Sequence, residues 1–397
     1  MSEDLSRRQQ AVRLRLAHVS VVFICATLRC AKSWFYKWWS RYQECGTGGL
    51  HDASRAPHTS PNRIPDETRQ LVLAIRDRLA QRRGPKGRYR FIGAPTIQNE
   101  LKGLGCRPLP ALRSIELILH QAGRTNPPMR FSPPCHEQAY PRLQATRSNQ
   151  VHEFDLVGPR YLKGRHTRYS FLVYKDVFDQ AVYIEFCSAP SLSDVLGFVV
   201  RAWQHLGVPH SLQVDNDPLF AGTGRWSRSL NRFIRLVLRV GIELVFIPEG
   251  EPCRNGSVEN FNGWFQARLL AIPLHRPVQV RRELTALMDV CNNEHLHPHL
   301  GYRTARQVRR HQPIRHLPAN FKEHQRALPI PAGKITFMRR VRRSGRITIL
   351  REKIHVSKRL QGQYVRATLF TRSQTLKIYK GGKLIKNVRY PIRGGAE

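Results

Sequence analysis

Residues 248–270, PEGEPCRNGSVENFNGWFQARLL, constrain the fold of this chain more than any other stretch. A loop rich in Pro and Gly runs into Asn255-Gly256-Ser257, a sequence typical of a helix start. The predicted helix carries Glu259 in its first turn. The fold must therefore present an acid at the beginning of a helix that leaves a tight loop.

Two apolar segments offer matching acids. Asp155 ends the predicted strand 151–156, and Asp215 follows the predicted strand 211–214. Two strand-end aspartates and one helix glutamate are oxygen ligands of the kind that two divalent cations need to hold a phosphodiester for in-line attack. A lone acid is usually a solvated surface residue, so the inference depends on all three. We predict a two-metal site formed by Asp155, Asp215 and Glu259.

The charge of the chain indicates a polyanionic partner. Lys and Arg number 66 against 28 Asp and Glu, which gives a formal net charge of +38 over 397 residues. The surplus runs from the N-terminus to Arg393 and is therefore not one basic tail. With an apolar fraction of 41%, the chain is predicted to be globular, and its length indicates about two or three domains.

We expect a cytoplasmic, nucleoid-associated protein without membrane contact. No apolar run approaches the roughly 18 residues of a membrane span, and the N-terminus lacks the pattern of a signal peptide. The eight cysteines form no C-x-x-C motif, which favours reduced thiols over a zinc site or disulfides.

Residues 1–55 are predicted to form a helix-turn-helix domain. Helices are expected at 5–16, 21–28 and 32–42, with a corner at 29–31. Phe35, Trp38 and Trp39 would form the packing face of the third helix. The alternative is a small bundle with a merely solvated basic face. As a recognition helix, the third helix would present to DNA the outward side chains Lys32, Ser33, Tyr36, Lys37 and Arg41.

Residues 65–124 are predicted to be a second helix-turn-helix-like domain, with a purely structural helical connector as the alternative. Between its first two helices lies the stretch 84–93, GPKGRYRFIG, interpreted as a basic loop that follows a phosphate backbone. A stiff Pro-rich linker is expected over 125–149.

From residue 150 the pattern changes to strands and helices. Three strands in hairpin succession, followed by alternating helices and strands, are typical of a ribonuclease-H-like core, predicted over 150–312. Residues 330–397 alternate apolar and polar side chains and predict a small DNA-binding β-barrel. The fold class is therefore a multidomain chain with N-terminal all-α helix-turn-helix units, a central α/β core and a C-terminal all-β barrel.

Several other polar residues near these acids have two interpretations. Glu153 shares the face of Asp155 and could support it, whereas Asp176 is interpreted as a turn residue. Asn216 and Asn255 could cap and turn the backbone or contact substrate, and the histidines at 295, 297 and 299 could bind phosphate or pack. The candidate DNA contacts outside the N-terminal domain are Asn216, Arg254, Asn255, Arg268, His299 and Arg303.

These motifs together resemble the integrase-core transposases of bacterial insertion sequences, in the retroviral-integrase superfamily. The matching motifs are Phe154-Asp155, Phe171-Leu172-Val173 with Asp176, Val214-Asp215-Asn216, the segment 248–262 around Glu259, and Asn292 through Thr304; Trp38-x-x-Arg41-Tyr42 and Ser54-Arg55-x-Pro57 add to them. The resemblance implies that the acid triad binds two Mg²⁺ ions, which Mn²⁺ can replace. It also implies a homo-oligomer on double-stranded DNA, which hydrolyses phosphodiesters at element ends and transfers the 3′-hydroxyl into target DNA. Accessory transposition proteins are possible partners.

The sequence departs from the family pattern in three places. Asp217 replaces the usual glycine after Asp215-Asn216, which adds a charge near the metals. The spacing between Asp215 and Glu259 is long, with the surplus assigned to 221–232, and the helix after Glu259 has its first cation only at Arg268. An alternative function is therefore a catalytically weak or inactive transposase-derived DNA-binding protein. A structure-selective nuclease is a third possibility.

Overall fold

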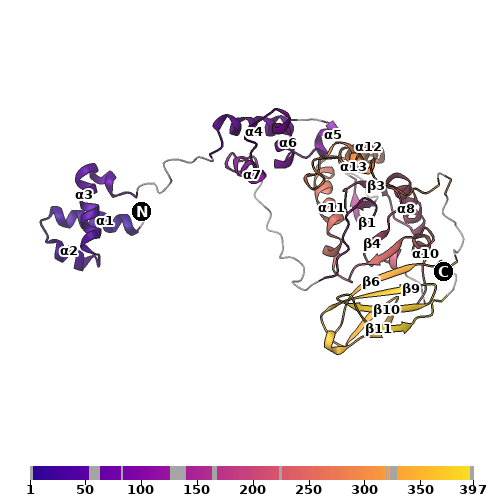
Figure 1. Ribbon diagram of the computed structural model, residues 1–397. Helices are drawn as coiled ribbons and strands as arrows, with labels where there is room; N and C mark the ends of the chain where they lie inside the picture. The colour runs from indigo at the N-terminus through magenta and orange to yellow at the C-terminus, as the bar shows by residue number, and fades with distance from the viewer. Residues whose placement is uncertain are drawn as a thin grey trace. The chain divides into compact units, whose positions relative to one another are not determined.

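A computed structural model describes two compact units, Met1–Ile64 and Pro65–Glu397 (Figure 1). No helix in the described part of the chain is long and apolar enough to cross a membrane. The Ser54-Arg55-x-Pro57 motif and most of the predicted Pro-rich linker lie outside the described residues, and the predicted domain boundaries stay predictions. The described residues are 3–52, 63–81, 84–125, 140–162, 168–222, 226–318, 320–321 and 329–393.

The first unit contains three helices where the periodicity predicts them. They pack around Ile24, Phe35 and Trp38, which are almost fully buried. Arg7 of the first helix donates to the carbonyls of Leu28 and Arg29, so a single guanidinium fixes the corner. The elements of this unit are α1 (Glu3–Leu16), α2 (Val21–Thr27), α3 (Lys32–Cys45) and the short 3-10 helix Gly46–Leu50.

The stretch predicted as a basic loop is instead a short helix, α5. Its cations are paired: the guanidinium of Arg88 lies 3.1 Å from the carboxylate of Glu283, and that of Arg90 lies 2.6 Å from Glu294. The buried Tyr89 hydroxyl also donates to Glu283, at 2.8 Å. These contacts stabilise a helix that its Gly and Pro content disfavours. The helices of this region are α4 (Asp66–Ala80), α5 (Gly84–Tyr89), α6 (Ala94–Gly103) and α7 (Leu112–Gln121).

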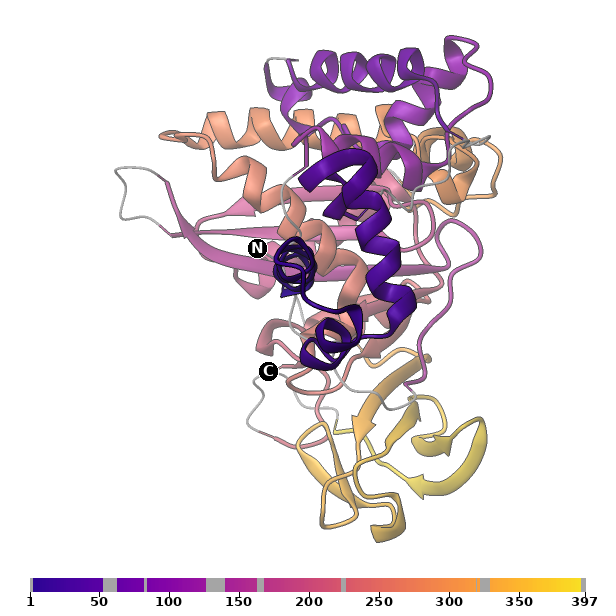
Figure 2. The same ribbon diagram turned by 90° about the vertical axis from the view of Figure 1, so that its left-hand side faces the viewer.

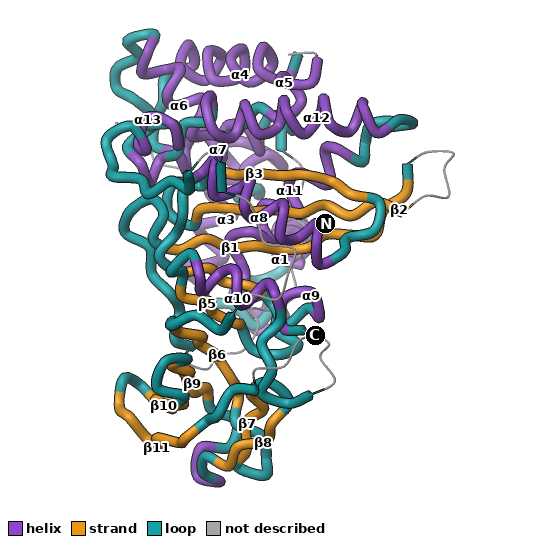
Figure 3. Tube along the Cα trace, turned by 90° about the vertical axis from the view of Figure 1, so that its right-hand side faces the viewer, coloured by secondary structure: helices purple, strands orange, loops and turns teal. Residues whose placement is uncertain are grey.

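The described strands of the second unit form one large mixed sheet and a hairpin. The large sheet has nine strands in the order β11-β10-β9-β6-β5-β4-β1-β2-β3, and β7 pairs with β8 (Figure 3). The parallel pairs β1–β4, β4–β5 and β5–β6 form its centre. The first five strands are β1 (Val151–Tyr161), β2 (Arg168–Asp176), β3 (Val182–Cys187), β4 (Ser211–Val214) and β5 (Glu243–Phe246).

Helices cover both faces of the central strands. On one face, Phe154 of β1 shares a core with Trp203 and Phe233 of α8 and α10. On the other, Val173 of β2 shares a core with Phe265 of α11 and with α12. Alternation along the strands sends neighbouring side chains to opposite cores. The helices here are α8 (Leu192–Leu206), α9 (Pro218–Ala221), α10 (Arg232–Arg239), α11 (Gly256–Leu269), α12 (Pro277–Asp289) and α13 (Ala305–Arg309).

The separate small barrel predicted for the C-terminal residues is not confirmed. The strands exist, but β6 pairs in parallel with β5 from Leu244–Ile335 to Phe246–Phe337, so β6, β9, β10 and β11 continue the core's own sheet, whereas β7 and β8 pair separately (orange to yellow in Figure 2). The rings of Phe246 and Phe337 stack 5.2 Å apart across this junction. The C-terminal strands are β6 (Lys334–Arg340), β7 (Arg346–Ile349), β8 (Glu352–His355), β9 (Tyr364–Phe370), β10 (Thr375–Lys380) and β11 (Lys383–Arg389).

Asp176 is more than the turn residue that the sequence indicates. Its fully buried carboxylate lies 2.7 Å from the guanidinium of Arg309 and 3.1 Å from the ring of His152, and it accepts the Asn149 N–H. Burial alone would raise the pKa of this carboxyl, but His152 and Arg309 outweigh burial and hold it below its ordinary value. The ion pair thus joins α13 to the end of β2.

Removing the Asp176 carboxylate should destabilise the second unit strongly. We expect Asp176→Ala to lower the free energy of unfolding by about 3–5 kcal/mol, because Arg309 keeps only one of its two carboxylate partners, Asp179, and the buried His152 ring and Asn149 N–H lose an acceptor. Since the pKa is depressed in the folded state, this contribution is present at neutral pH and is lost as the pH falls below about 4. Urea denaturation measures it. The control is Glu116→Ala, at an exposed ion pair, with an expected change within about 0.5 kcal/mol; equal effects would contradict the prediction.

Candidate active site

Asp155 lies inside β1 rather than at its end, because β1 runs on to Tyr161. Its neighbour β4 is short, however, and the parallel register between them ends at Glu153–Gln213. Two residues beyond that pair, Asp155 therefore lies beside the point where β4 has stopped and Asp215 begins a loop. Asp155 accepts the N–H of Leu156 and, at 2.6 Å, the side-chain amide of Asn262.

Asp215 is held by the backbone of its own loop. Its Oδ1 accepts the N–H of Asp217 at 3.0 Å. The carboxylate of Asp217 in turn accepts the N–H of Leu219 at 2.8 Å and caps α9. The carboxylate of Asp217, which stands where the sequence comparison expects a glycine, is therefore hydrogen-bonded to the first turn of α9.

Glu259 is positioned by a cap that comes from another element. Asn255 precedes α11 but makes no side-chain capping hydrogen bond. Instead, the buried Glu153 of β1 accepts the N–H of Val258 at 2.7 Å. Because Val258 directly precedes Glu259, this bond ties the helix that carries the third acid to the strand that carries the first. The hydrogen bond from Val258 is the contact through which Glu153 could support the acids.

A row of polar side chains crosses three strands beneath this helix end. Lys175, Glu153 and Gln213 are register partners on β2, β1 and β4. The Lys175 ammonium donates to the carbonyl of Ser257 at 2.9 Å, and Gln213 donates to Glu153 at 3.2 Å. Burial raises the pKa of Glu153 to about 7 and lowers that of Lys175 to about 8. Lys175 and Gln213 were missed in the sequence because they carry no motif; only strand register brings them here.

The three acids are close enough to act on one another electrostatically. Burial, and then the charge of Asp215, raises the pKa of Asp155 to about 7. Burial also raises the pKa of Asp215, with Asp217 adding to it, and raises that of Glu259, with Asp215 adding to it. Like charges that raise one another's pKa values in a partly buried site are typical of functional carboxylates.

The donor set fits divalent cations. In this strongly basic chain, none of the three acids has a Lys, Arg or His within ion-pair distance among the described residues. The buried Oδ1 of Asn262, beside Asp155, also has no hydrogen-bond partner. Asn262 lies one helical turn after Glu259, a spacing that could have identified it from the sequence.

The acids do not converge on one point. Among the described residues, no three His, Cys, Asp or Glu side chains lie close enough to hold a single ion together. Two ions about 3.5–4 Å apart are spanned by carboxylates that need not all touch the same ion. The described acids therefore do not form a closed one-ion site.

Three of the candidate DNA contacts are engaged inside the protein. The side chain of Arg254 is 5% exposed and pairs with Glu251 at 3.0 Å. Asn255 is buried and receives a hydrogen bond from Gln213. Asn216 uses both ends of its amide, donating to Ile247 and accepting from Arg339. For these three residues the structure shows internal, structural contacts.

The remaining candidates outside the first unit are not brought to the acids by any contact among the described residues. Arg268 packs over the ring of Trp264, and burial lowers its pKa. His299 is exposed and bonds the carbonyl of Phe178, and Arg303 donates to Leu300. Burial lowers the pKa values of His295 and His297 to about 4 and 3, and the His295 ring stacks on Phe91.

The side chains predicted as a recognition face on α3 differ in exposure. Lys32, Ser33 and Lys37 are exposed, whereas Arg41 is half-buried with its guanidinium 5.0 Å from the centre of the Trp38 ring. The predicted packing residues Phe35 and Trp38 are buried, and Trp39 stacks on Phe35.

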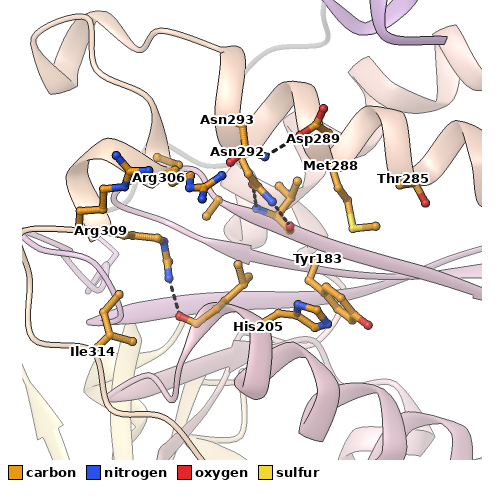
Figure 4. Close-up of a pocket in the computed structure, with 15 residues that line it drawn as sticks. Tyr183, His205, Thr285, Met288, Asp289, Asn292, Asn293, Arg306, Arg309 and Ile314 are labelled. Atoms are coloured by element: carbon orange, nitrogen blue, oxygen red, sulfur yellow. Dashed lines mark hydrogen bonds between the residues drawn. The ribbon is translucent and has the colours of Figure 1, made fainter.

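A cavity of about 620 Å³ lies elsewhere on the second unit, between β3, the end of α8, α12 and α13 (Figure 4). Tyr183, His205, Met288 and Arg306 are among its lining residues. Beside it, the Asn292 amide bonds both the N–H and the carbonyl of Val182 on β3. None of the three acids lines this cavity.

Residues 240–304 match the family model of the integrase core domain. The match runs from β5 through Glu259 to Thr304, whereas Asp155 and Asp215 precede it. It confirms, at the level of the family, the resemblance to integrases and transposases that the motifs carry.

The chain is also similar to solved structures. The HTLV-2 integrase catalytic core domain in complex with magnesium is 18% identical, over 42% of this chain and 99% of that one, with a TM-score of 0.32. The intasome of simian T-cell lymphotropic virus in complex with PP2A regulatory subunit B56 gamma is 17% identical, over 76% and 93%, with a TM-score of 0.35. The catalytic core domain of BIV integrase is 16% identical, over 41% and 93%, with a TM-score of 0.31.

Because its pKa is raised, the ionised carboxylate of Asp155 lowers the free energy of unfolding in metal-free buffer. Because its folded-state pKa of about 7 exceeds the ordinary value of 3.8, stability should fall as the pH rises from about 4 to about 7. We expect Asp155→Asn, with chelator present at pH 8, to raise the free energy of unfolding by about 1–3 kcal/mol, and by less at pH 5. Urea denaturation at both pH values measures this. Glu116→Gln, at an exposed site, should change nothing; an Asn variant less stable than wild type at pH 8 would refute the prediction.

Proposed function

We propose that this protein is a DNA transposase or integrase that hydrolyses phosphodiesters at element ends and transfers the 3′-hydroxyl into target DNA. The observation that carries the proposal is the cluster of Asp155, Asp215 and Glu259, three partly buried acids without basic partners in the described chain. The integrase core match over Glu259 and its surroundings supports the same reaction class.

Each acid has a distinct part in this proposal. Asp155 from within β1, Asp215 from the end of the adjacent strand β4, and Glu259 from the facing helix would hold two Mg²⁺ ions, which Mn²⁺ can replace. When bound, the ions supply stabilisation of the charge that develops on the phosphate and lower the pKa of the attacking water or 3′-hydroxyl. Glu153 fixes the helix, and the amide of Asn262 orients Asp155. Strand and helix would thus direct the three carboxylates toward one phosphodiester.

Double-stranded DNA is the proposed substrate, both as element ends and as target. The exposed cations of α3 suit phosphate and base contacts in the major groove, and the net charge of +38 adds salt-sensitive affinity. Joining two ends to one target requires at least two active sites, so we propose a homo-oligomer on DNA. Accessory transposition proteins belong to the same proposal as possible partners.

Substitution of any of the three acids should abolish catalysis and spare binding. We expect Asp155→Asn, Asp215→Asn and Glu259→Gln each to reduce Mg²⁺-dependent nicking of DNA that flanks the gene by at least about 10³-fold, since each removes a metal ligand. Nicks mapped on labelled DNA measure the activity, and gel shift measures binding.

The control for these variants is Glu185→Gln on β3, whose carboxylate pairs with Arg201 at 2.7 Å, away from the acids. It should cleave like wild type. If wild type binds DNA but makes no nick with Mg²⁺ or Mn²⁺, the protein is the non-catalytic DNA-binding descendant instead. Cleavage that follows DNA structure rather than the element ends would indicate a structure-selective nuclease.

The α3 surface should contribute to DNA affinity through phosphates or bases. We expect Lys37→Ala to weaken binding of the full-length protein several-fold and to reduce the slope of log affinity against log salt by about one. Fluorescence anisotropy at four salt concentrations measures both. The matched control is Arg13→Ala, an exposed cation on α1 of the same unit. Equal losses for Lys37→Ala and Arg13→Ala would mean that α3 has no special part in binding.

A further inference from the structure

A buried arginine of the C-terminal strands reaches the loop of the second acid. Arg339, on β6, is 6% exposed and donates hydrogen bonds in three directions. Its Nη2 lies 2.8 Å from Oδ1 of Asn216, its Nη1 lies 2.9 Å from the carbonyl of Ile247, and its Nε lies 3.1 Å from the carbonyl of Thr348. The first of these partners directly follows Asp215.

Asn216 links Arg339 to the residue that follows β5. Its Nδ2 donates to the carbonyl of Ile247 at 2.8 Å, the same oxygen that receives Nη1 of Arg339. The guanidinium, the amide and the carbonyl therefore form a closed triangle immediately behind Asp215. Such a triangle restricts the backbone from which the Asp215 carboxylate projects.

The contact to Asn216 is not needed to hold the sheet together. Strands β5 and β6 already pair through their backbones, from Leu244–Ile335 to Phe246–Phe337. Burial lowers the pKa of Arg339 to about 10, so it stays charged at neutral pH, and the nearest carboxylate, Glu249, is 3.8 Å away and 45% exposed. A buried cation that is so weakly paired lowers the stability of the fold. Its presence therefore indicates a role other than strand pairing.

The C-terminal strands also contact the segment that precedes the third acid, Glu259. The Tyr364 hydroxyl of β9 donates to the carboxylate of Glu251 at 2.7 Å, and Arg254 contacts both groups, 3.0 Å from Glu251 and 3.3 Å from the Tyr364 hydroxyl. Residues 252–255 form the short 3-10 helix that leads directly into α11 and Glu259. The C-terminal strands thus contact the chain beside two of the three acids.

We propose that Arg339 is a positioning residue of the active site, which acts through Asn216 to fix Asp215 for metal binding. This inference rests on the proposed function, since it assigns Arg339 to the same site. Strands β6 and β9, which extend the sheet, would then support the positions of the acids.

The test measures metal binding without DNA. Metal-free full-length protein is titrated with Mn²⁺ alone by calorimetry at pH 7.5, and nicking is measured separately. We expect Arg339→Met to weaken Mn²⁺ binding about 10- to 100-fold, the range typical of residues that orient metal ligands. Arg339→Lys keeps the charge but has no planar fork, so it should restore only part of the affinity. Gel-shift affinity for DNA should stay within about twofold, because no DNA contact is removed.

A double-mutant cycle separates positioning from a general loss of stability. Asn216→Ala breaks the same link from the half-buried side, so the test does not depend on how well Arg339→Met folds. If Arg339 acts through Asn216, the double variant binds Mn²⁺ no more weakly than the worse single variant. Losses that multiply would overturn the proposal, because the two residues would then act independently.

The matched control is Thr336→Val, on the same strand. Thr336 is buried and bonds Glu243 and Thr368 at 2.8 and 3.0 Å, away from the acids. It should lower the melting temperature and leave Mn²⁺ affinity unchanged. Wild-type affinity in Arg339→Met, or an equal loss in Thr336→Val, would overturn the positioning role alone. Absence of both Mn²⁺ binding and nicking in the wild type would overturn the proposed function as well.

Discussion

The geometry of the acid site depends on one hydrogen bond, from the N–H of Val258 to the carboxylate of Glu153. A helix end offers unpaired N–H groups and a partial positive charge, so an anion there stabilises the helix by up to about 2 kcal/mol in a partly buried setting. The same carboxylate is costly to bury, as its raised pKa shows, and Lys175 offsets part of that cost. Because Glu153 lies two residues before Asp155, the bond links the position of the third acid to that of the first.

The element order was predictable because hydrophobic periodicity is local, whereas the pairing of elements was not. Period-two alternation over residues 330–397 predicted strands there but cannot name their partners, and the partner of β6 is β5 of the core. In α5, Gly and Pro predicted a loop, but ion pairs with acids far along the chain favour a helix. Propensity was overruled here by tertiary contacts that no sequence window contains.

For the candidate site, the sequence indicates the three acids and much less of their surroundings. Asp155, Asp215 and Glu259 carry a motif with recognisable spacing. Arg254, by contrast, has the sequence appearance of a DNA contact because a cation beside a motif is assumed to be exposed, yet it is 5% exposed and paired with Glu251. Burial depends on β9, more than a hundred residues later, which supplies Tyr364 over the same guanidinium. Sequence near an acid therefore reveals the chemistry of the acid better than the role of its neighbours.

The pairing of β6 with β5 extends the central sheet beyond the predicted end of the core. The predicted boundary at residue 312 falls between strands of a single sheet, because β6 lies beside β5. Without β6, the buried strand β5 would become an edge, and the ring of Phe246 would lose its stacking partner Phe337. Asn216 would also lose the guanidinium behind it. The second acid is thus held by residues on both sides of that boundary, so the structural support of the site extends to β6 even though its three carboxylates all precede residue 260.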